Sequence, residues 1–137
     1  MSSNLKLSIC IPTYNRPEKL ERVLLQIIPQ LTVECELLIR DDSGNENSAN
    51  LVKRLAKNRV CLYRGPKIGL DLANLFLLEK ARGKFVWWLS DDDEVDAKII
   101  VKIIETIDKH KQLTFIWLNF LSAFSKVPAV SEKTDGF

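Results

Sequence analysis

Apolar positions along the chain follow two patterns, short apolar runs and stripes with a spacing of three or four residues. The runs are typical of strands and the wider spacing is typical of amphipathic helices. The runs predict five strands, at residues 5–11, 36–40, 60–64, 85–89 and 113–120. The stripes predict helices at residues 48–57, 70–81 and 97–109, and a further one with its apolar face running from Leu20 to Leu31.

Local chemistry predicts where the first strand ends and the first helix begins. Pro12 is expected to end the first strand, because proline has no backbone N–H to donate. Asn15 is expected to cap the first helix, with Pro17 in the first turn and Glu18 three residues after the cap.

Strands that alternate with helices through short connections predict an α/β fold. Right-handed crossovers then give a three-layer α/β/α arrangement with a mostly parallel central sheet. Ligands of such sheets bind beyond the carboxyl ends of the strands. Three polar loops are expected at that edge, at residues 12–16, 41–45 and 91–93.

Composition narrows the class of protein. With 137 residues, 46% hydrophobic, the chain has apolar material for one core. The formal net charge of +2 gives no electrostatic reason to expect a nucleic-acid partner. Without a signal peptide or an apolar run long enough to cross a bilayer, the chain is predicted to be soluble and cytoplasmic, with buried free thiols. The three cysteines are Cys10, Cys35 and Cys61.

An acidic triplet carries the clearest candidate chemistry. Asp91, Asp92 and Asp93 follow the apolar run at residues 84–90, which is predicted to be a strand buried on both faces. Adjacent carboxylates repel one another unless a cation or strong donors hold them. Oxygen ligands without Cys or His favour Mg²⁺ or Mn²⁺, which shares its coordination shell with substrate phosphates. The alternative is that Asp93, Glu94 or Asp96 only caps the following helix.

The other two loops and a lysine supply further candidates, each with a structural alternative. Asp42, after the second strand, is placed to accept from a ribose or a base, although a solvated turn with Asp41 is an equal alternative. Tyr14 could stack on a base, or serve as a core or lid residue. Arg16 is a candidate for the nucleotide or a plain surface charge, and Lys67 could reach a phosphate or remain solvated.

Four sequence blocks together resemble the family 2 glycosyltransferases with the GT-A fold. They occur in the family's order and cover roughly the first hundred residues. The nearest likeness is to bacterial enzymes that add sugars to surface polysaccharides, such as the abequosyltransferase-like group. The blocks are SICIPTYNR at residues 8–16, LIRDDS at 38–43, GLD at 69–71 with Asn74, and ARGKFVWWLSDDD at 81–93.

The resemblance implies transfer of a sugar from a UDP-, GDP- or dTDP-linked donor to a sugar or lipid-linked acceptor, with inversion and a metal ion. By position, Pro12, Thr13 and Tyr14 would line the base pocket, and Asp42 would accept from the base. Asp91 would sit near the ribose, and Asp92 or Asp93 would bind the metal. An enzyme of this kind is expected in the cytoplasm, with a lipid-linked acceptor placing it at the inner face of the membrane.

Two departures from the family pattern limit what the resemblance implies. Ala73 stands where the family often has arginine, just before Asn74. Family members also run well past this length, so residues 1–124 are expected to be the donor-binding half and residues 125–137 an irregular tail or truncation point. No catalytic base is assigned, because the acids after Asp108 lie only in the tail.

Two other function classes are alternatives to sugar transfer. An aspartyl phosphatase or receiver domain needs an acid after the first strand, and Pro12, Thr13 and Tyr14 stand there instead. A non-catalytic nucleotide-sugar binding module is the remaining alternative. It would self-associate through an exposed apolar face where the missing half would pack, involving Phe115, Trp117, Phe120 or Phe124.

Overall fold

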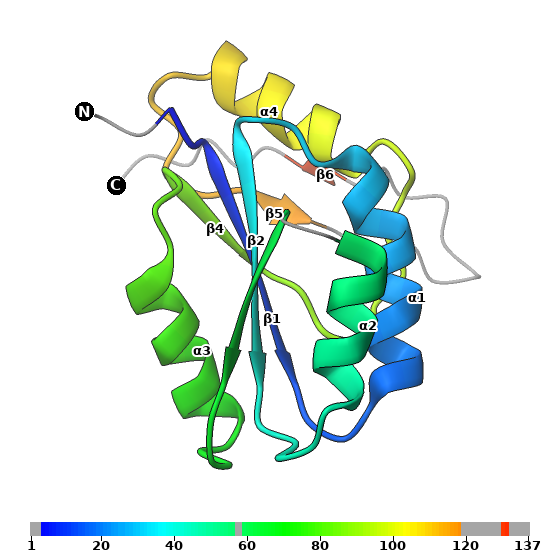
Figure 1. The fold of residues 1–137 in the computed structure, drawn as a ribbon. Helices are drawn as coiled ribbons and strands as arrows, with labels where there is room; N and C mark the ends of the chain where they lie inside the picture. Colours follow the sequence, from blue (N-terminus) through cyan, green and yellow to red (C-terminus); the bar gives the residue numbers. More distant parts are fainter. Residues whose placement is uncertain (1–3, 57–58, 119–129, 132–137) are drawn as a thin grey trace. The chain divides into compact units, whose positions relative to one another are not determined.

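The computed structural model describes residues 4–56, 59–118 and 130–131. They belong to two compact units, residues 1–105 and 106–137, which we describe separately. Figure 1 shows the elements. In chain order these are β1 (Leu7–Thr13), α1 (Pro17–Ile27), the 3₁₀ helix η1 (Ile28–Gln30), β2 (Cys35–Asp41), α2 (Asn47–Ala56), β3 (Val60–Arg64), α3 (Leu70–Lys80), β4 (Phe85–Trp88), α4 (Ile99–Lys109), β5 (Trp117–Leu118) and β6 (Val130–Ser131).

The first unit contains a four-stranded parallel sheet with the order β3-β2-β1-β4. β1 is central, and Ile9 is paired with Leu37 of β2 on one side and Trp87 of β4 on the other. The chain builds the sheet outward from β1 through β2 to β3 and then returns to the opposite side of β1. The order therefore reverses between β1 and β4, and ligands of open α/β sheets bind at such a point.

Helices cover both faces of this sheet, which confirms the predicted α/β layers. α3 lies on one face, where Leu77 packs with Cys10 and Leu38. Because side chains alternate along a strand, Ile9 and Leu37 face the opposite side, toward α1 and α2 (Figure 1). The buried stripe of α1 is made of Leu20, Val23, Leu24 and Ile27, as its spacing predicts.

The predicted end of the first strand was wrong, because β1 continues through Pro12 to Thr13. Pro12 pairs with Arg40 of β2, whereas the pairing of β1 with β4 ends at Cys10. Pro12 therefore lies beyond the part of β1 that pairs with β4, where a missing N–H removes no hydrogen bond of that pairing.

The predicted Asn15 cap was also wrong. Arg16 is the N-cap of α1 and makes no side-chain capping bond, and Pro17 begins the helix. Asn15 instead adopts a left-handed conformation, with φ of 51°, which asparagine tolerates better than most residues. Its N–H donates to Ser43 Oγ at 2.8 Å, so it joins the loops after β1 and β2.

β4 differs from the strand buried on both faces that the apolar run predicted. Phe85, Val86 and Trp87 are only half-buried, and 49% of Trp88 is exposed. The reason is position: in the described part of the sheet β4 is an edge strand with β1 as its one neighbour.

In the second unit, the strand predicted at residues 113–120 is shorter and belongs to another sheet. Trp117 and Leu118 pair antiparallel with Ser131 and Val130, so two residues of the predicted irregular tail form β6. Residues 119 and 120 lie outside the described part. Phe115 is 66% exposed, whereas Phe120, Phe124 and the side chain of Trp117 are not described, so the predicted self-association surface stays a prediction.

An ionic network around the buried Glu36 closes the end of the sheet opposite the carboxyl edge. Glu36 at the start of β2 accepts from Ser8 Oγ at 2.7 Å, from the Arg82 backbone N–H at 2.7 Å and from Arg82 Nη2 at 2.8 Å. Gly83 donates its N–H to Ser8 Oγ at 2.8 Å, and a Cβ there would lie 2.6 Å from the Ser8 nitrogen. The network thus requires glycine at the entrance to β4.

The three cysteines are free, but only Cys10 is buried; Cys35 is half-buried and Cys61 is exposed. The prediction of buried thiols was wrong for Cys61, because β3 is the other edge of the described sheet, and for Cys35, which is the first residue of β2. Burial, followed by the charge of Glu36, raises the pKa of Cys10 to about 12, so this thiol stays protonated. Among the described residues, no helix combines the length and the apolar character that a membrane crossing requires.

We predict that Glu36→Gln destabilises the first unit by about 2 kcal/mol at neutral pH, because buried donors lose a charged acceptor. Burial alone would raise the pKa of Glu36, but the bonds from Ser8 and Arg82 and the charge of Arg82 outweigh it and lower the pKa below 4.5. This contribution is therefore present above the unfolded-state pKa and is lost as the pH falls through the lower folded-state value.

The measurement is urea unfolding followed by tryptophan fluorescence from about pH 7 to pH 3, where E36Q should lose stability less steeply than the wild type. Glu34→Gln is the matched control, since Glu34 pairs with Lys6 with 33% and 27% of their side chains exposed, and its loss should cost less than about 1 kcal/mol. Equal losses of unfolding free energy in E36Q and E34Q would contradict the prediction that the network around Glu36 stabilises the unit more than the Glu34–Lys6 pair does.

Candidate donor-binding site

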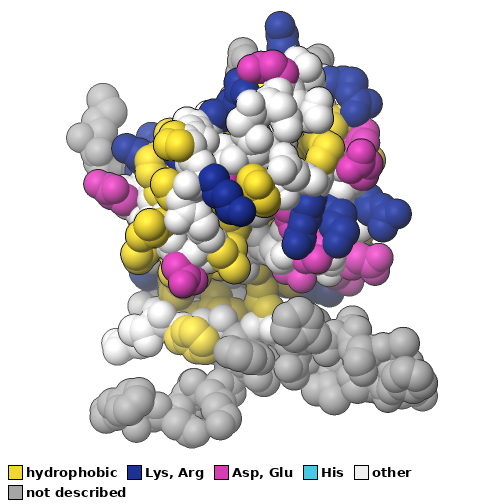
Figure 2. Space-filling view, turned by 90° about the horizontal axis from the view of Figure 1, so that it is seen from below, with side chains coloured by type: hydrophobic (Ala, Val, Ile, Leu, Met, Phe, Trp, Pro, Cys, Tyr) yellow, Lys and Arg dark blue, Asp and Glu magenta, His cyan; other side chains and the backbone are white. Residues whose placement is uncertain are grey.

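The loops that follow β1, β2 and β4 meet at one edge of the sheet. In Figure 1 the arrowheads of β1, β2 and β3 point to the bottom, so Figure 2, seen from below, looks onto this edge. Acidic and basic side chains lie beside one another there, without a large patch of a single sign (Figure 2). The edge therefore offers paired charges, not the uniformly acidic surface that the triplet alone would give.

Asp91 is the buried centre of the site. It is 4% exposed, and its Oδ2 accepts from Thr13 Oγ1 at 2.9 Å. Its Oδ1 lies 3.3 Å from Arg16 Nη1. Thr13 is the last residue of β1 and is itself buried, so this hydrogen bond joins the ends of the two strands between which the sheet order reverses.

Asp92 is the accessible member of the triplet. Its Oδ2 lies 3.5 Å from both Arg16 Nη1 and Lys19 Nζ, and 44% of its side chain is exposed. The Ser90 hydroxyl, which donates to Asp92 Oδ1 at 2.5 Å, is the main cause that lowers the pKa of Asp92 below 3.8. Partial burial works against this, while Lys19 and Arg16 lower the pKa further. Asp92 is therefore a carboxylate at neutral pH. Its ion pairs with Arg16 and Lys19 are exposed to solvent and are therefore weak.

Asp93 turns back on its own loop, where its Oδ2 accepts from the Ser90 N–H at 2.9 Å. The capping alternative applies to Asp96 instead, whose Oδ1 accepts from the Lys98 N–H at 2.7 Å just before α4 begins. Thus the three aspartates of the triplet make different contacts, and none of their hydrogen bonds within the described part of the chain caps α4.

The described residues contain no group of three His, Cys, Asp or Glu side chains arranged to hold a metal. The oxygen atoms of this edge nevertheless suit a hard cation, which one exposed carboxylate, that of Asp92, could hold. Mg²⁺ and similar ions commonly bind through one or two carboxylates, with waters and substrate phosphates completing the shell. The fit is therefore to a site that the substrate completes.

Asp42 is buried and accepts three hydrogen bonds. Its Oδ1 accepts from Arg40 Nε at 2.8 Å, and its Oδ2 accepts from the backbone N–H groups of Ile68 and Gly69 at 3.0 and 3.2 Å. A carboxylate offers about four acceptor positions, so one remains for a ligand. Asp42 consequently anchors the loop between β3 and α3 as well as facing the edge.

Asp41 is 1% exposed and ends β2. Its Oδ1 accepts from the Ser43 N–H at 2.9 Å, an arrangement typical of a turn, whereas its Oδ2 has no hydrogen-bond partner among the described residues. The turn alternative therefore describes Asp41, while Asp42 makes the longer-range contacts.

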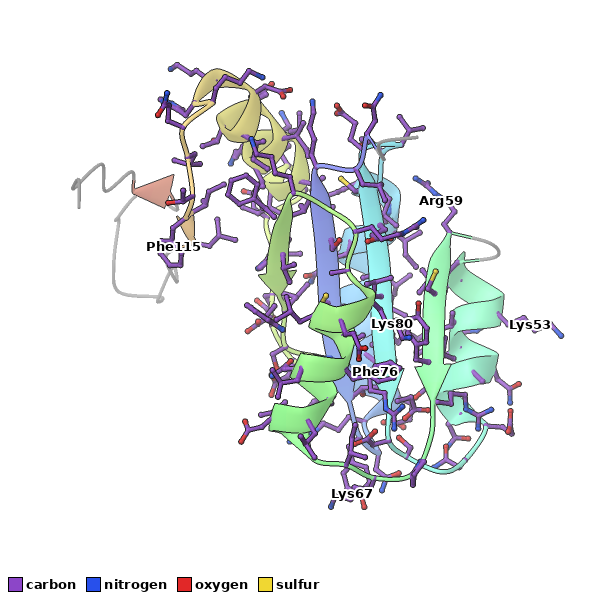
Figure 3. The ribbon with its side chains drawn as sticks, turned by 90° about the vertical axis from the view of Figure 1, so that its left-hand side faces the viewer. Lys53, Arg59, Lys67, Phe76, Lys80 and Phe115 are labelled. Carbon is purple, nitrogen blue, oxygen red and sulfur yellow. The ribbon has the colours of Figure 1, made fainter. Side chains whose placement is uncertain are left out.

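Tyr14 and Lys67 come together across the edge from different loops. The Lys67 Nζ lies 4.1 Å from the centre of the Tyr14 ring, and 43% of Tyr14 is exposed. Figure 3 shows Lys67 at the lower end of the sheet, in the loop before α3. Pro12 is half-buried at the end of β1, so it and Tyr14 border the same edge.

Sequence reasoning missed two residues of this site. Lys19 was hidden because it lies on a helix predicted mainly from its apolar stripe. Arg40 was counted only as the end of an apolar strand, although a cation placed within a buried run, two residues before an aspartate, signals an internal ion pair.

Comparison with known proteins agrees with this architecture. The sequence model described as Glycosyl transferase family 2 matches residues 8–124. The abequosyltransferase RfbV of Salmonella typhimurium is 31% identical over 106 residues, which are 73% of this chain and 32% of that protein. A GalNAc(5)-diNAcBac-PP-undecaprenol beta-1,3-glucosyltransferase of Campylobacter jejuni is 32% identical over 94 residues, which are 66% of this chain and 30% of that protein. The chain thus spans about 30% of the length of these relatives.

Solved structures share the fold. TarS of S. aureus in complex with UDP-GlcNAc gives a TM-score of 0.67 at 24% identity, covering 78% of this chain and 32% of that one. The mannosyltransferase PcManGT of Pyrobaculum calidifontis, in complex with GDP-Man and Mn²⁺, gives 0.65 at 19% identity, covering 74% and 32%. The predicted GT-A fold and the predicted family are confirmed: this chain belongs to glycosyl transferase family 2.

Proposed function

We propose that this chain is the donor-binding part of a glycosyltransferase, which moves a sugar from a nucleoside diphosphate sugar to an acceptor hydroxyl with inversion. The observation that carries the proposal is the hydrogen-bonded meeting of Thr13, Arg16 and Asp91 where the sheet order reverses. The family match over residues 8–124 supports a donor-binding domain that covers residues 1–124.

The nucleoside is proposed to lie between the loops after β1 and β2. Pro12 and Tyr14 border that space, and the ring of Tyr14 offers an exposed face on which a base can stack. Asp42 retains one acceptor position for a base N–H group. Asp91, with its orientation fixed by Thr13, is proposed to lie beside the ribose.

The diphosphate is proposed to lie over Asp92, Arg16 and Lys19, with Lys67 at the opposite side. Without a ligand, Arg16 and Lys19 are both paired with Asp92 at 3.5 Å. The pairs are exposed and individually weak, so a diphosphate competes well for the same cations. The N-terminal end of α1, which Arg16 caps, adds a partial positive charge at this place.

Asp92 is the residue proposed to hold Mg²⁺ or Mn²⁺, with Asp93 and Asp91 fixing the turn around it. A bound ion of this kind would supply Lewis-acid stabilisation of the charge that builds on the departing diphosphate. The residues of the chain contribute by orienting the donor: Asp91 and Tyr14 hold the nucleoside, while Arg16, Lys19 and Lys67 balance phosphate charge.

The acceptor is proposed to be a sugar of a bacterial surface polysaccharide, carried on a lipid. The name of the Campylobacter relative specifies an undecaprenol-linked substrate, which supports this choice. A transferase with such an acceptor would work on the cytoplasmic side, at the surface of the membrane.

Calorimetric titration with UDP, GDP and dTDP, with and without Mn²⁺, tests the donor site. One nucleotide is expected to bind more tightly with the ion, and Asp92→Asn should weaken the metal-dependent part by about tenfold or more. Asp96→Asn is the matched control, because Asp96 is another exposed aspartate of the same connection, paired with Lys102, and should bind as the wild type does. Absence of binding by any nucleotide under either condition would refute the donor site.

Thr13→Val should weaken nucleotide binding about fivefold, equally with and without Mn²⁺, since the buried Asp91 loses the hydroxyl that orients it. Thr13→Ser keeps a hydroxyl and should restore most of the affinity. The same titrations measure both variants. Similar affinities for T13V and T13S would show that the hydrogen bond to Asp91 does not position the nucleotide.

A further inference from the structure

Arg40 is a buried cation that the roles proposed above do not use. It is 6% exposed and follows the three apolar residues Leu37, Leu38 and Ile39 of β2. Nε donates to Asp42 Oδ1 at 2.8 Å and Nη2 donates to the Pro66 carbonyl at 2.9 Å. The guanidinium carbon lies 4.9 Å from the centre of the Phe76 ring. A single side chain thus joins β2, α3 and the loop between β3 and α3.

That loop, residues 65–69, is attached at two points to Arg40 of β2 and to Asp42, the residue just after β2, and Arg40 and Asp42 are themselves paired. Pro66 accepts from Arg40 directly, and the N–H groups of Ile68 and Gly69 donate to Asp42, which Arg40 holds from the other side. Lys67 lies between these attachment points. Its backbone is consequently fixed on either side, which leaves its side chain extended over Tyr14 at 4.1 Å.

Gly65 shows how closely the guanidinium fills its place. A Cβ at residue 65 would lie 2.7 Å from Arg40 Nη2 and 3.0 Å from Nη1, so only glycine leaves room for this arrangement. Phe76, labelled in Figure 3, covers the guanidinium from α3 and packs edge-on against Tyr63 of β3, with ring centres 5.3 Å apart. The arginine is therefore held on several sides.

We propose that Arg40 is a positioning residue for the donor site: through Asp42 and Pro66 it fixes the loop of residues 65–69 and so sets Lys67 over the ring of Tyr14. The resulting Lys67–Tyr14 pair is a preset clamp at the mouth of the nucleotide site. The expected effect of Arg40 on nucleotide affinity rests on the proposed function. The expected effect of Arg40 on the position of Lys67 does not.

The position of Lys67 can be followed without any nucleotide. Lysines carrying ¹³C-methyl groups from reductive methylation keep their charge, and a lysine above an aromatic ring has its methyl signal displaced by the ring current. Lys67→Arg assigns the signal, and Tyr14→Leu should move it to the position of a solvent-exposed lysine. Lys53, exposed on α2 and labelled in Figure 3, provides the reference signal.

Arg40→Met is expected to move the Lys67 signal to the same unshifted position and to weaken nucleotide binding about fivefold, the loss expected for one cation–π contact. Lys67→Met should weaken binding equally, and the double variant should be no weaker than either one, since both remove the same clamp. Arg64→Met is the matched control. Arg64 ends the neighbouring strand and also bonds a backbone carbonyl and a glutamate, but it lies outside this network.

Gly65→Ala is the second variant, in case the loss of a buried arginine unfolds the chain. It removes no group and displaces the guanidinium by steric contact alone, so it should move the Lys67 signal as R40M does. An unchanged Lys67 signal in folded G65A or R40M would overturn the proposal. So would an unchanged nucleotide affinity in variants whose signal has moved. If the wild type binds no nucleotide, the proposed function fails, while the signal still decides whether Arg40 positions Lys67.

Discussion

The candidate site depends on one hydrogen bond, from the Thr13 hydroxyl to the Asp91 carboxylate. It joins the end of the central strand to the turn after β4, across the place where the sheet order reverses. Parallel strands bring their carboxyl ends together but do not by themselves bring two side chains into contact. The exact register of β1 with β4 does so, and the buried bond then keeps Asp91 oriented while its neighbours remain accessible.

Around this bond the triplet resolves its own repulsion in an unexpected way. Sequence reasoning expected three adjacent carboxylates to require a metal, yet Asp91 has a hydroxyl and a guanidinium, Asp92 has a hydroxyl and two cations, and Asp93 has a backbone N–H. Each carboxylate is satisfied within the chain. What distinguishes Asp92 is exposure, so it is the one that can exchange its partners for a ligand at little cost.

The fold was predictable because its strands and helices have distinct periods, and the core positions of α1 follow directly from spacing. The pattern could not tell which strands would be neighbours. It therefore predicts that the run at residues 84–90 is fully buried and that the run at residues 113–120 joins the same sheet, whereas β4 is an edge of the described sheet and β5 pairs with β6. In the site, the sequence blocks identified the loops, but contacts such as Lys67 with Tyr14 depend on the order of the strands. Arg40 was overlooked since the length of its side chain, not its place in the sequence, determines what it reaches.

Gly65 and Arg40 occupy one shared volume, and this ties their evolutionary histories together. A descendant that acquired a side chain at residue 65 would have to displace or shorten the side chain of residue 40, and a descendant that shortened residue 40 first would free residue 65 from its restriction to glycine. Across descendants of this chain, the two positions should therefore vary jointly, as a single inherited character and not as two independent ones.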